Sequence, residues 1–201
     1  RNNMRLYQYH PSGNCYKIRL LLNQLQIPYE KVEVDILKRE SRTEEFLHKN
    51  LNGRIPVLEV DGRFLPESNA ALYYLARDTD YFPQDKFAQA QVLQWMFFEQ
   101  YSHEPYIATV RFWVAFQKSA EQNAAEIQKR MPLGYAALEV MDKHLNERNF
   151  FVENRYSIAD IALFAYTHVA EEGGFELNRF PNVQSWIQRV QQQPRFISIL
   201  D

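Results

Sequence analysis

A tight β-hairpin is predicted by the stretch Val57-Leu58-Glu59-Val60-Asp61-Gly62-Arg63-Phe64-Leu65. Two short, mainly apolar segments flank Asp61-Gly62, a pair that readily adopts the positive φ angles of a two-residue turn. After the hairpin, Ser68 is placed to cap a helix that carries Ala71 and Leu75 on one side. This part of the sequence therefore predicts two antiparallel strands followed by a helix.

The region before the hairpin adds a strand, a helix and a second strand. The first strand is the aromatic-rich run Leu6-Tyr7-Gln8-Tyr9, which Pro11-Ser12-Gly13 brings to an end. Apolar residues then recur at helical spacing from Cys15 to Gln26, with Asn14 in a position to cap the helix. Charged residues alternate with valines from Glu30 to Asp35, as in a half-buried strand parallel to the first. The order β-α-β, β-β-α describes an α/β domain with a small mixed sheet.

The remainder of the chain is typical of helices. Long helical patterns cover about 86–118 and 123–147, and shorter ones start at Ser157 and at Asn182. The stretch Ser157-Ile158-Ala159-Asp160 matches a capping box, in which the serine accepts a backbone N–H and the acid reaches back to the cap. An all-α second domain is therefore predicted.

The change from mixed strands and helices to helices alone sets the domain boundaries. The segment from Asp78 to Asp85 has the polar, Pro-containing composition of a linker. We expect an α/β domain over residues 4–77, a linker over 78–85 and an all-helical domain over 86–201. The sequence does not indicate where residues 197–201 pack.

Charge and composition exclude several classes of function. The chain has 201 residues with 23 basic and 25 acidic side chains, a net charge of -2 at pH 7, so nucleic acid is not an expected partner. Its single cysteine, Cys15, allows neither an internal disulfide nor a CxxC redox pair. The five histidines show no metal-ligand spacing, and there is no Gly-rich phosphate loop, so no metal or nucleotide chemistry is expected.

The same features bear on the compartment. No apolar run approaches the roughly 18 residues of a membrane span. The stretch Arg1-Asn2-Asn3 lacks the charged-then-apolar profile of a signal peptide. Together with the single cysteine, which suits a reducing compartment, these observations predict a cytoplasmic protein without a membrane partner.

Three stretches carry a joint pattern, namely Ser12-Gly13-Asn14-Cys15-Tyr16-Lys17-Ile18, Asn52-Gly53-Arg54-Ile55-Pro56-Val57-Leu58 and Leu65-Pro66-Glu67-Ser68-Asn69-Ala70. Their letters, order and spacing together resemble the glutathione transferase superfamily of the cytosolic type. The stretch from Phe151 to Asp160 is likewise similar to the family's cap of the core helix in its second domain. The resemblance covers residues 4–201, and it looks closest to bacterial members with a Ser-x-Asn-Cys loop.

The resemblance implies a thioredoxin-like N-terminal domain that binds glutathione as cosubstrate. It implies an all-α domain that receives a hydrophobic electrophile, a cis peptide bond before Pro56, and a homodimer. A tyrosine mechanism is not expected, because the activating tyrosine of the animal classes would fall near Gln8.

Three residues are candidates for activating the thiol. Glutathione must attack as a thiolate, and a thiol with a pKa near 8.5 is mostly protonated at neutral pH. Ser12 can donate its hydroxyl to the sulfur, assisted by the positive end of the following helix. Asn14 has an amide donor for the same sulfur, or it is only a helix cap. Cys15 offers an alternative, a mixed disulfide with glutathione, unless it is a small core residue.

The other expected contacts to glutathione come from the resemblance. Backbone groups of Ile55-Pro56 would pair with the cysteinyl part like an added strand. Glu67-Ser68 would meet the γ-glutamyl ammonium and carboxylate. Arg42 and Arg54 are candidates for the glycyl carboxylate, because a guanidinium suits carboxylate recognition.

An aromatic group in the helical domain is expected to form the wall that receives the electrophile. Its members are Tyr101, Tyr106, Phe112, Trp113 and Phe116. Aromatic residues at helical spacing also build cores, so some of the five are expected there. Tyr106 and Trp113 are the preferred wall residues.

The leading hypothesis is an enzyme that adds the glutathione thiolate to a hydrophobic electrophile. One alternative is a glutathione-dependent thiol oxidoreductase or peroxidase, acting through Cys15 or through bound glutathione. Another is a non-catalytic interaction module with the same fold. Ser12 favours the first over the second, whereas Ile55-Pro56 and Glu67-Ser68 favour glutathione binding over the third.

Overall fold

The computed structural model describes residues 3–201, which form two compact units. The first unit contains the residues up to Thr79 together with 194–201, and the second contains residues 80–193. Residues 1 and 2, part of the stretch that argued against a signal peptide, lie outside the described residues. Residues 194–201 thus differ from the expected domain range of 86–201, because their backbone binds side chains of the first unit.

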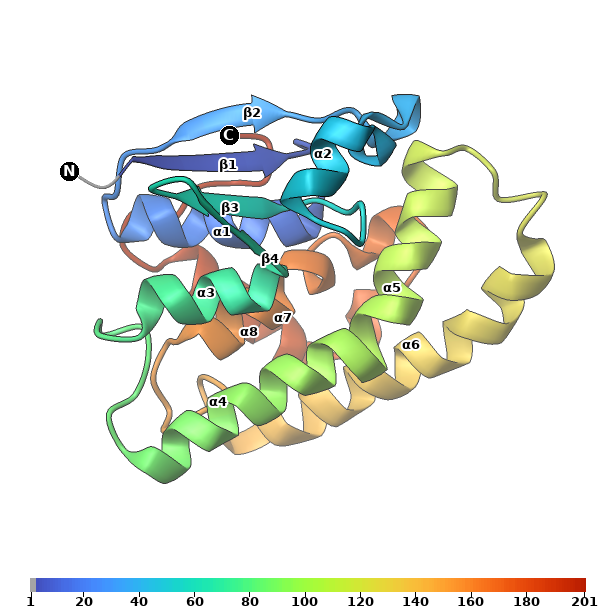
Figure 1. Ribbon diagram of the computed structural model, residues 1–201. Helices are drawn as coiled ribbons and strands as arrows, with labels where there is room; N and C mark the ends of the chain where they lie inside the picture. The colour runs from blue at the N-terminus through green and yellow to red at the C-terminus, as the bar shows by residue number, and fades with distance from the viewer. Residues whose placement is uncertain (1–2) are drawn as a thin grey trace. The chain divides into compact units, whose positions relative to one another are not determined.

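The first unit is built on a mixed four-stranded sheet with the strand order β2-β1-β3-β4 (Figure 1). β1 (Met4–Gln8) pairs parallel with β2 (Glu30–Glu33) and antiparallel with β3 (Val57–Val60). β3 in turn pairs antiparallel with β4 (Arg63–Pro66). The strands and the helices α1 and α3 follow the predicted β-α-β, β-β-α order, and the structure adds a short helix between β2 and β3 that the sequence pattern did not indicate.

The hairpin between β3 and β4 turns at the predicted pair. Asp61 and Gly62 have φ angles of 50° and 80°, as a two-residue hairpin turn with both central residues in the left-handed region requires. The prediction from the Asp-Gly pair is confirmed.

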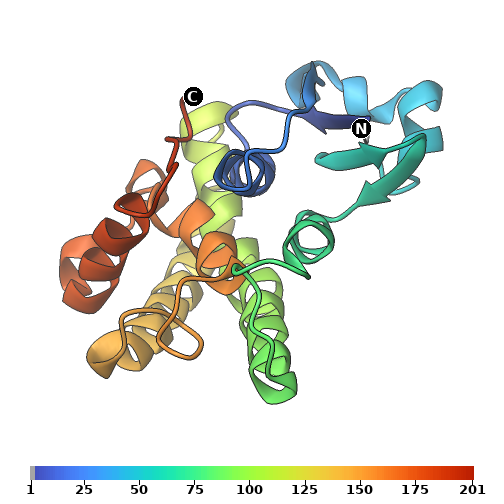
Figure 2. The ribbon, with the colours of Figure 1, turned by 90° about the vertical axis from the view of Figure 1, so that its left-hand side faces the viewer.

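Helices cover both faces of the sheet, α1 (Gly13–Gln24) and α3 (Ser68–Ala76) on one side and α2 (Glu44–Lys49) on the other (Figure 2). Two 3-10 turns, Ile36–Lys38 and Glu40–Arg42, connect β2 to α2. Side chains alternate along each strand, so Tyr7 and Val57 pack with Phe46 of α2. Their neighbours Leu6 and Leu58 are fully buried on the opposite face.

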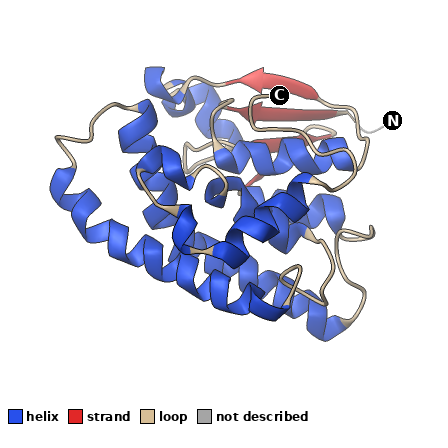
Figure 3. Cartoon of the chain, turned by 180° about the vertical axis from the view of Figure 1, so that it is seen from behind, coloured by secondary structure: helices blue, strands red, loops and turns tan. Residues whose placement is uncertain are grey.

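The second unit consists of helices and one isolated β-bridge (Figure 3). Its α-helices are α4 (Lys86–Phe98), α5 (Glu104–Arg111), α6 (Ala124–His144), α7 (Ile158–Thr167) and α8 (Pro181–Gln191). Short 3-10 turns lie at Leu145–Glu147, Ala170–Gly173 and Leu177–Arg179.

The helix expected over 86–118 is interrupted by two π-helical turns, Glu99–His103 and Phe112–Phe116. Pro105, near the start of α5, explains the first interruption, because it has no N–H to continue the α-helical ladder. The N–H of Glu104 instead donates to the carbonyl of Glu99. The helical periodicity of the sequence concealed this division.

α7 is the central helix of the second unit. All ten of its residues are buried, and it packs against α4, α5 and α8. The predicted capping box is confirmed: Ser157 Oγ accepts the N–H of Ala159 at 3.2 Å, and Asp160 Oδ2 accepts the N–H of Ser157 at 2.9 Å. Asp160 Oδ1 also accepts from Trp186 Nε1 at 2.9 Å and from the N–H of Phe151 at 3.2 Å.

Candidate functional site

Three loops meet at one end of the sheet because of the strand register. Tyr7, Val57 and Pro66 are aligned across β1, β3 and β4. β1 and β4 end there, whereas β3 begins there. The loop after β1, the turn before β3 and the start of α3 therefore lie at the same edge. The register brings the three sequence motifs together within the first unit.

Ser12 caps α1. Its backbone is extended, with φ -67° and ψ 127°, and its Oγ accepts the N–H of Cys15 at 3.3 Å. The prediction that Asn14 caps the helix is wrong, because α1 begins at Gly13 and the residue before the helix makes the capping bond. A hydroxyl that accepts a hydrogen bond still has one hydrogen to donate. Capping and donation to a sulfur are thus compatible roles for Ser12.

The starts of α1 and α3 are electropositive. Neither helix has an acidic residue in its first turn. The unpaired amides at a helix start act as roughly half an elementary positive charge. Two such ends at one edge suit a ligand with more than one anionic group.

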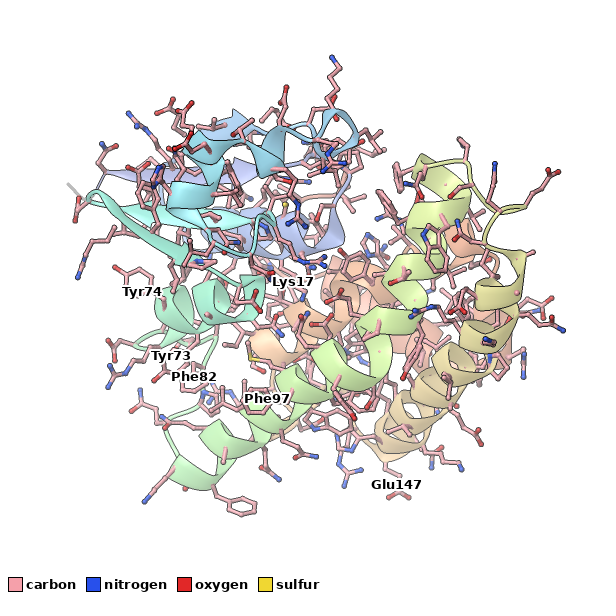
Figure 4. The ribbon with its side chains drawn as sticks, turned by 45° about the vertical axis from the view of Figure 1, so that its right-hand side comes forward. Lys17, Tyr73, Tyr74, Phe82, Phe97 and Glu147 are labelled. Atoms are coloured by element: carbon pink, nitrogen blue, oxygen red, sulfur yellow. The ribbon has the colours of Figure 1, made fainter. Side chains whose placement is uncertain are left out.

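Asn14 joins these two helix starts. Ser68 Oγ donates to Asn14 Oδ1 at 3.1 Å. Lys17 Nζ donates to Ser68 Oγ at 3.3 Å and to Asn69 Oδ1 at 3.1 Å. Lys17 comes from α1 and is fully buried (Figure 4). The network places a cationic side chain beside the residue expected to bind the γ-glutamyl carboxylate.

Sequence reasoning gave Lys17 no role. A single lysine in an apolar helical pattern is usually solvated, because lysine is rarely fully buried. The signal that could have found it is its i,i+3 spacing to Asn14, which puts both polar side chains on one face of the helix.

Glu67, and not Ser68, precedes α3. The expectation that Ser68 caps this helix is wrong: Ser68 is its first residue and is buried, and its hydroxyl donates to Asn14 instead. Glu67 has φ 77° and ψ 111°, a conformation that non-glycine residues seldom adopt, and its side chain makes no capping bond. Such backbone outliers cluster at ligand-binding sites.

The peptide bond between Ile55 and Pro56 is cis, as the resemblance implies. Ile55 is partly buried and packs against the cluster around Tyr7. Asn50 holds the preceding loop: its carbonyl accepts from the N–H of Gly53 at 2.9 Å, and its Nδ2 donates to the carbonyl of Arg54 at 2.9 Å.

Of the two candidate arginines, one belongs to this loop and the other packs against it. Arg54 belongs to it and is exposed. Arg42 lies against Gly53, where an added Cβ would come within 2.8 Å of Arg42 Nη1. Gly53 also has φ 63°, so this position suits glycine for two independent reasons.

Cys15 is inaccessible to solvent. Its Sγ accepts the N–H of Tyr9 at 3.5 Å. Burial raises the pKa of the Cys15 thiol to about 11, although the hydrogen bonds from Ser12 and Tyr9 lower it. Such a thiol is a poor nucleophile near neutral pH, so these observations favour a packing role.

No tyrosine occupies the position expected for an activating hydroxyl. Gln8 is fully buried, and its amide accepts from Arg19 Nη1 at 2.8 Å and donates to Glu33 Oε1 at 2.6 Å. Of its neighbours, Tyr7 donates to Glu59 Oε2 at 2.9 Å. Burial raises the pKa of both Tyr7 and Tyr9.

The aromatic candidates of the second unit differ in exposure. Tyr101 is 83% exposed, and the other four are partly buried. Two of them carry a guanidinium over the ring: Arg130 over Trp113 at 5.4 Å and Arg111 over Phe116 at 4.6 Å. Each of these contacts lies within the second unit.

Residues 3–201 contain neither a cluster of metal ligands nor a membrane-spanning helix. Within this range, no three His, Cys, Asp or Glu side chains gather closely enough to hold a metal ion. None of the helices in the described part of the chain has the length and apolar character needed to span a bilayer.

Comparisons with known proteins agree on the family. The model of the glutathione S-transferase N-terminal domain matches residues 2–77, and that of the glutathione S-transferase C-terminal domain matches residues 92–194. A crystal structure of a glutathione S-transferase from Pseudomonas fluorescens Pf-5 is 53% identical, covers 98% of this chain and 99% of that chain, and superimposes with a TM-score of 0.96.

Two curated relatives are more distant. The glutathione S-transferase-like protein LUC7 of a Fusarium species is 33% identical, over 92% of this chain and 87% of its own length. The disulfide-bond oxidoreductase YfcG of Escherichia coli is 28% identical, over 92% of this chain and 88% of its own length. The two matched domain models, the fold and these relatives show that this chain belongs to the glutathione S-transferase family.

Proposed function

We propose that this chain is a glutathione transferase that activates the glutathione thiol as a thiolate for attack on a hydrophobic electrophile. The observation that carries the proposal is the edge at which α1 and α3 begin, each without an acidic residue in its first turn, joined by the 3.1 Å hydrogen bond from Ser68 to Asn14. Ser12, with Asn14 beside it, donates to the sulfur. Each pKa unit by which the thiol is lowered corresponds to about 1.4 kcal/mol, which a charge-assisted hydrogen bond can supply.

Glutathione is oriented by the other motifs. Its cysteinyl backbone pairs with Ile55 beside the cis Pro56, and its γ-glutamyl group lies at Glu67-Ser68. The buried Lys17 ammonium supports a carboxylate there, because it donates to Ser68 Oγ at 3.3 Å. Arg42 and Arg54, associated with one loop, are proposed for the glycyl carboxylate.

The electrophile is proposed to contact aromatic residues of the second unit. Four of the five candidates lie in its π-helical turns, Tyr101 in Glu99–His103 and the others in Phe112–Phe116. Turns of this kind occur frequently at functional sites. The fifth, Tyr106, lies on α5 between the two turns.

A homodimer in the cytoplasm is part of the proposal. Phe87 and Phe97 of α4 are 71% and 69% exposed, the latter labelled in Figure 4. Large apolar side chains exposed on one helix support an interface with another chain.

A second candidate function is glutathione-dependent thiol-disulfide exchange. Its support is the 28% identical relative named a disulfide-bond oxidoreductase. Because Cys15 is buried with a raised pKa, this reaction would use the thiol of bound glutathione and not Cys15.

Calorimetric titration with glutathione, followed by a conjugation assay over several electrophile classes, tests the proposal. We expect saturable binding, a kcat for Ser12→Ala about a hundredfold below wild type, and a kcat for Cys15→Ala close to wild type. Loss of turnover in Cys15→Ala alone would contradict the assignment of Ser12. Disulfide reduction without conjugation would select the second candidate. If the folded protein binds no glutathione, both enzyme candidates are contradicted, and the non-catalytic interaction module is the remaining hypothesis.

A further inference from the structure

Residues 194–201 pack on the first unit without forming a helix or strand (Figure 3). A segment of this kind does not make the regular backbone hydrogen bonds of a helix or a sheet. Carbonyl groups that leave water need hydrogen-bond donors from elsewhere. Ile197 and Ile199 are only partly exposed, and their carbonyls obtain these donors from side chains of α1.

The donors near the start of α1 are two large buried side chains. Tyr16 Oη donates to the carbonyl of Ile197 at 2.5 Å, and Arg19 Nη2 donates to the carbonyl of Ile199 at 2.9 Å. Both side chains are fully buried and, at i and i+3, lie on one face of the helix.

The far end of α1 holds the segment through separate contacts. Asn23 Nδ2 donates to the carbonyl of Arg195 at 2.7 Å. Arg195 Nε in turn donates to the carbonyl of Gln24, the last residue of α1, at 2.8 Å. A guanidinium at this position suits the last carbonyls of a helix, which point beyond its final turn.

The same segment is also tied to the loop that carries Ser12. His10 Nε2 lies 3.2 Å from the carbonyl of Leu200, which can only accept, so this nitrogen carries the hydrogen. Arg19 reaches the other side of the loop, because its Nη1 donates to Gln8 Oε1 at 2.8 Å. The segment 194–201 is therefore connected to the loop between β1 and α1 in two ways. It binds His10 directly, and it binds Arg19, which in turn binds Gln8 at the end of β1.

We propose that residues 194–200 act as a strap that positions the loop carrying Ser12. The proposal rests on the proposed function, since it concerns the hydroxyl that would donate to the glutathione sulfur. A displacement of reacting groups by about 1 Å can cost about a hundredfold in rate, so small loosening of this loop lowers kcat. The groups expected to bind the rest of glutathione belong to other loops, so KM changes little.

Two matched variants distinguish an effect on the position of the Ser12 loop from a general loss of stability. Tyr16→Phe removes one hydroxyl that holds the strap beside the loop and keeps the buried ring. Asn23→Ala removes one hydrogen bond to the same strap at the far end of α1. In Tyr16→Phe we expect kcat to fall about tenfold with KM within about twofold, and the pH-rate profile to move to higher pH. In Asn23→Ala, kcat and the pH-rate profile stay at their wild-type values.

Amide hydrogen exchange over residues 9–16 gives a readout that needs no glutathione. Faster exchange in Tyr16→Phe than in Asn23→Ala supports the strap even if the wild-type protein does not turn over glutathione, an outcome that would remove only the proposed function. Equal exchange in both variants, or equal losses of kcat in both, overturns the strap.

Discussion

Helices α1 and α7 both begin after a serine that accepts a backbone N–H, yet the two helix starts differ in charge. In α7, Asp160 lies in the first turn and closes a capping box with Ser157. In α1, Ser12 has no acidic residue after it in the first turn. One helix start contains its own acid, and the other has none.

This difference distinguishes the start of α7, whose N–H groups bind a side chain of the same helix, from the start of α1, which can bind an anionic ligand. Asp160 is fully buried among three N–H donors. Burial raises the pKa of its carboxyl to about 7, while the hydrogen bonds lower it. The start of α1 has the neutral Ser12 hydroxyl as an acceptor but no carboxylate in its first turn, so a thiolate can supply the negative charge there.

The largest expected effect is on stability, from Asp160→Ala. Loss of the acceptor for Trp186 Nε1, Ser157 N and Phe151 N should lower the free energy of unfolding by about 3–5 kcal/mol. Urea unfolding followed by circular dichroism measures it. Ser12→Ala is the matched control and should cost about 1 kcal/mol. Equal losses in the two variants would contradict the distinction between these helix starts.

A partly buried histidine of the second unit predicts how stability depends on pH. Burial lowers the pKa of His168 from 6.5 to about 4, and its ring stacks on Phe164 at 4.2 Å. Because the folded pKa lies below the unfolded one, this contribution to stability is complete above pH 6.5 and is lost as the pH falls through 4. The loss is on the order of 3 kcal/mol.

His168→Phe keeps an aromatic ring and removes the titration. The difference in unfolding free energy between wild type and this variant should therefore shrink from pH 7 to pH 4. Asp160, whose pKa is shifted in the opposite direction, is the same in both proteins and cancels. A difference that stays constant with pH would contradict the assignment.

Ser68→Ala tests the start of α3, the other helix that has no acidic residue in its first turn. The variant loses the hydroxyl proposed for the γ-glutamyl carboxylate, and Lys17 and Asn14 lose a partner. We expect the Kd for glutathione to rise about tenfold, as for one hydrogen bond to a charged group. Calorimetry measures it, with Ser157→Ala as the control that leaves Kd unchanged. A Kd unaltered by Ser68→Ala would remove this residue from the binding site.

The smallest effect is expected from Asn14→Asp, which gives α1 an acid in its first turn as in α7. The new carboxylate keeps an acceptor for Ser68, but it removes the Asn14 amide donor and competes with the thiolate at the helix start. The thiol pKa of bound glutathione should rise by about half a unit, since such a charge contributes about 0.3–1 kcal/mol. Thiolate absorbance against pH measures it. The same change at exposed Asn178 in the second unit serves as the charge control, and a shift of equal size there would point to overall charge.

Local signals explain what the sequence could predict. The Asp61-Gly62 turn, the Ser157 capping box and the positions of the four strands along the chain depend on residues that are close in the sequence, and all three are confirmed. The family was predicted from three motifs, and the register of the sheet brings these motifs together at one end of the strands. The start of α1 was placed wrongly because Ser12 and Asn14 are both good caps by residue type.

Other features depend on contacts that no local pattern encodes. Lys17 is buried because its partners lie on α3, more than 50 positions later in the chain. The donors on α1 that bind residues 194–200 look in the sequence like ordinary polar positions of a helix. Pro105, by contrast, is a local signal for the first π-helical turn, and the helical periodicity around it concealed that break.

The attachment of residues 194–201 to α1 has a consequence for synthesis on the ribosome. The sheet and the helices of the first unit emerge first, and at about 5–20 residues per second the second unit then takes on the order of ten seconds to make. During that interval Tyr16 and Arg19 have not met the carbonyls that they bind in the finished protein. The first unit is begun first and completed last, so a nascent chain stalled before residue 194 carries a first unit without its final segment.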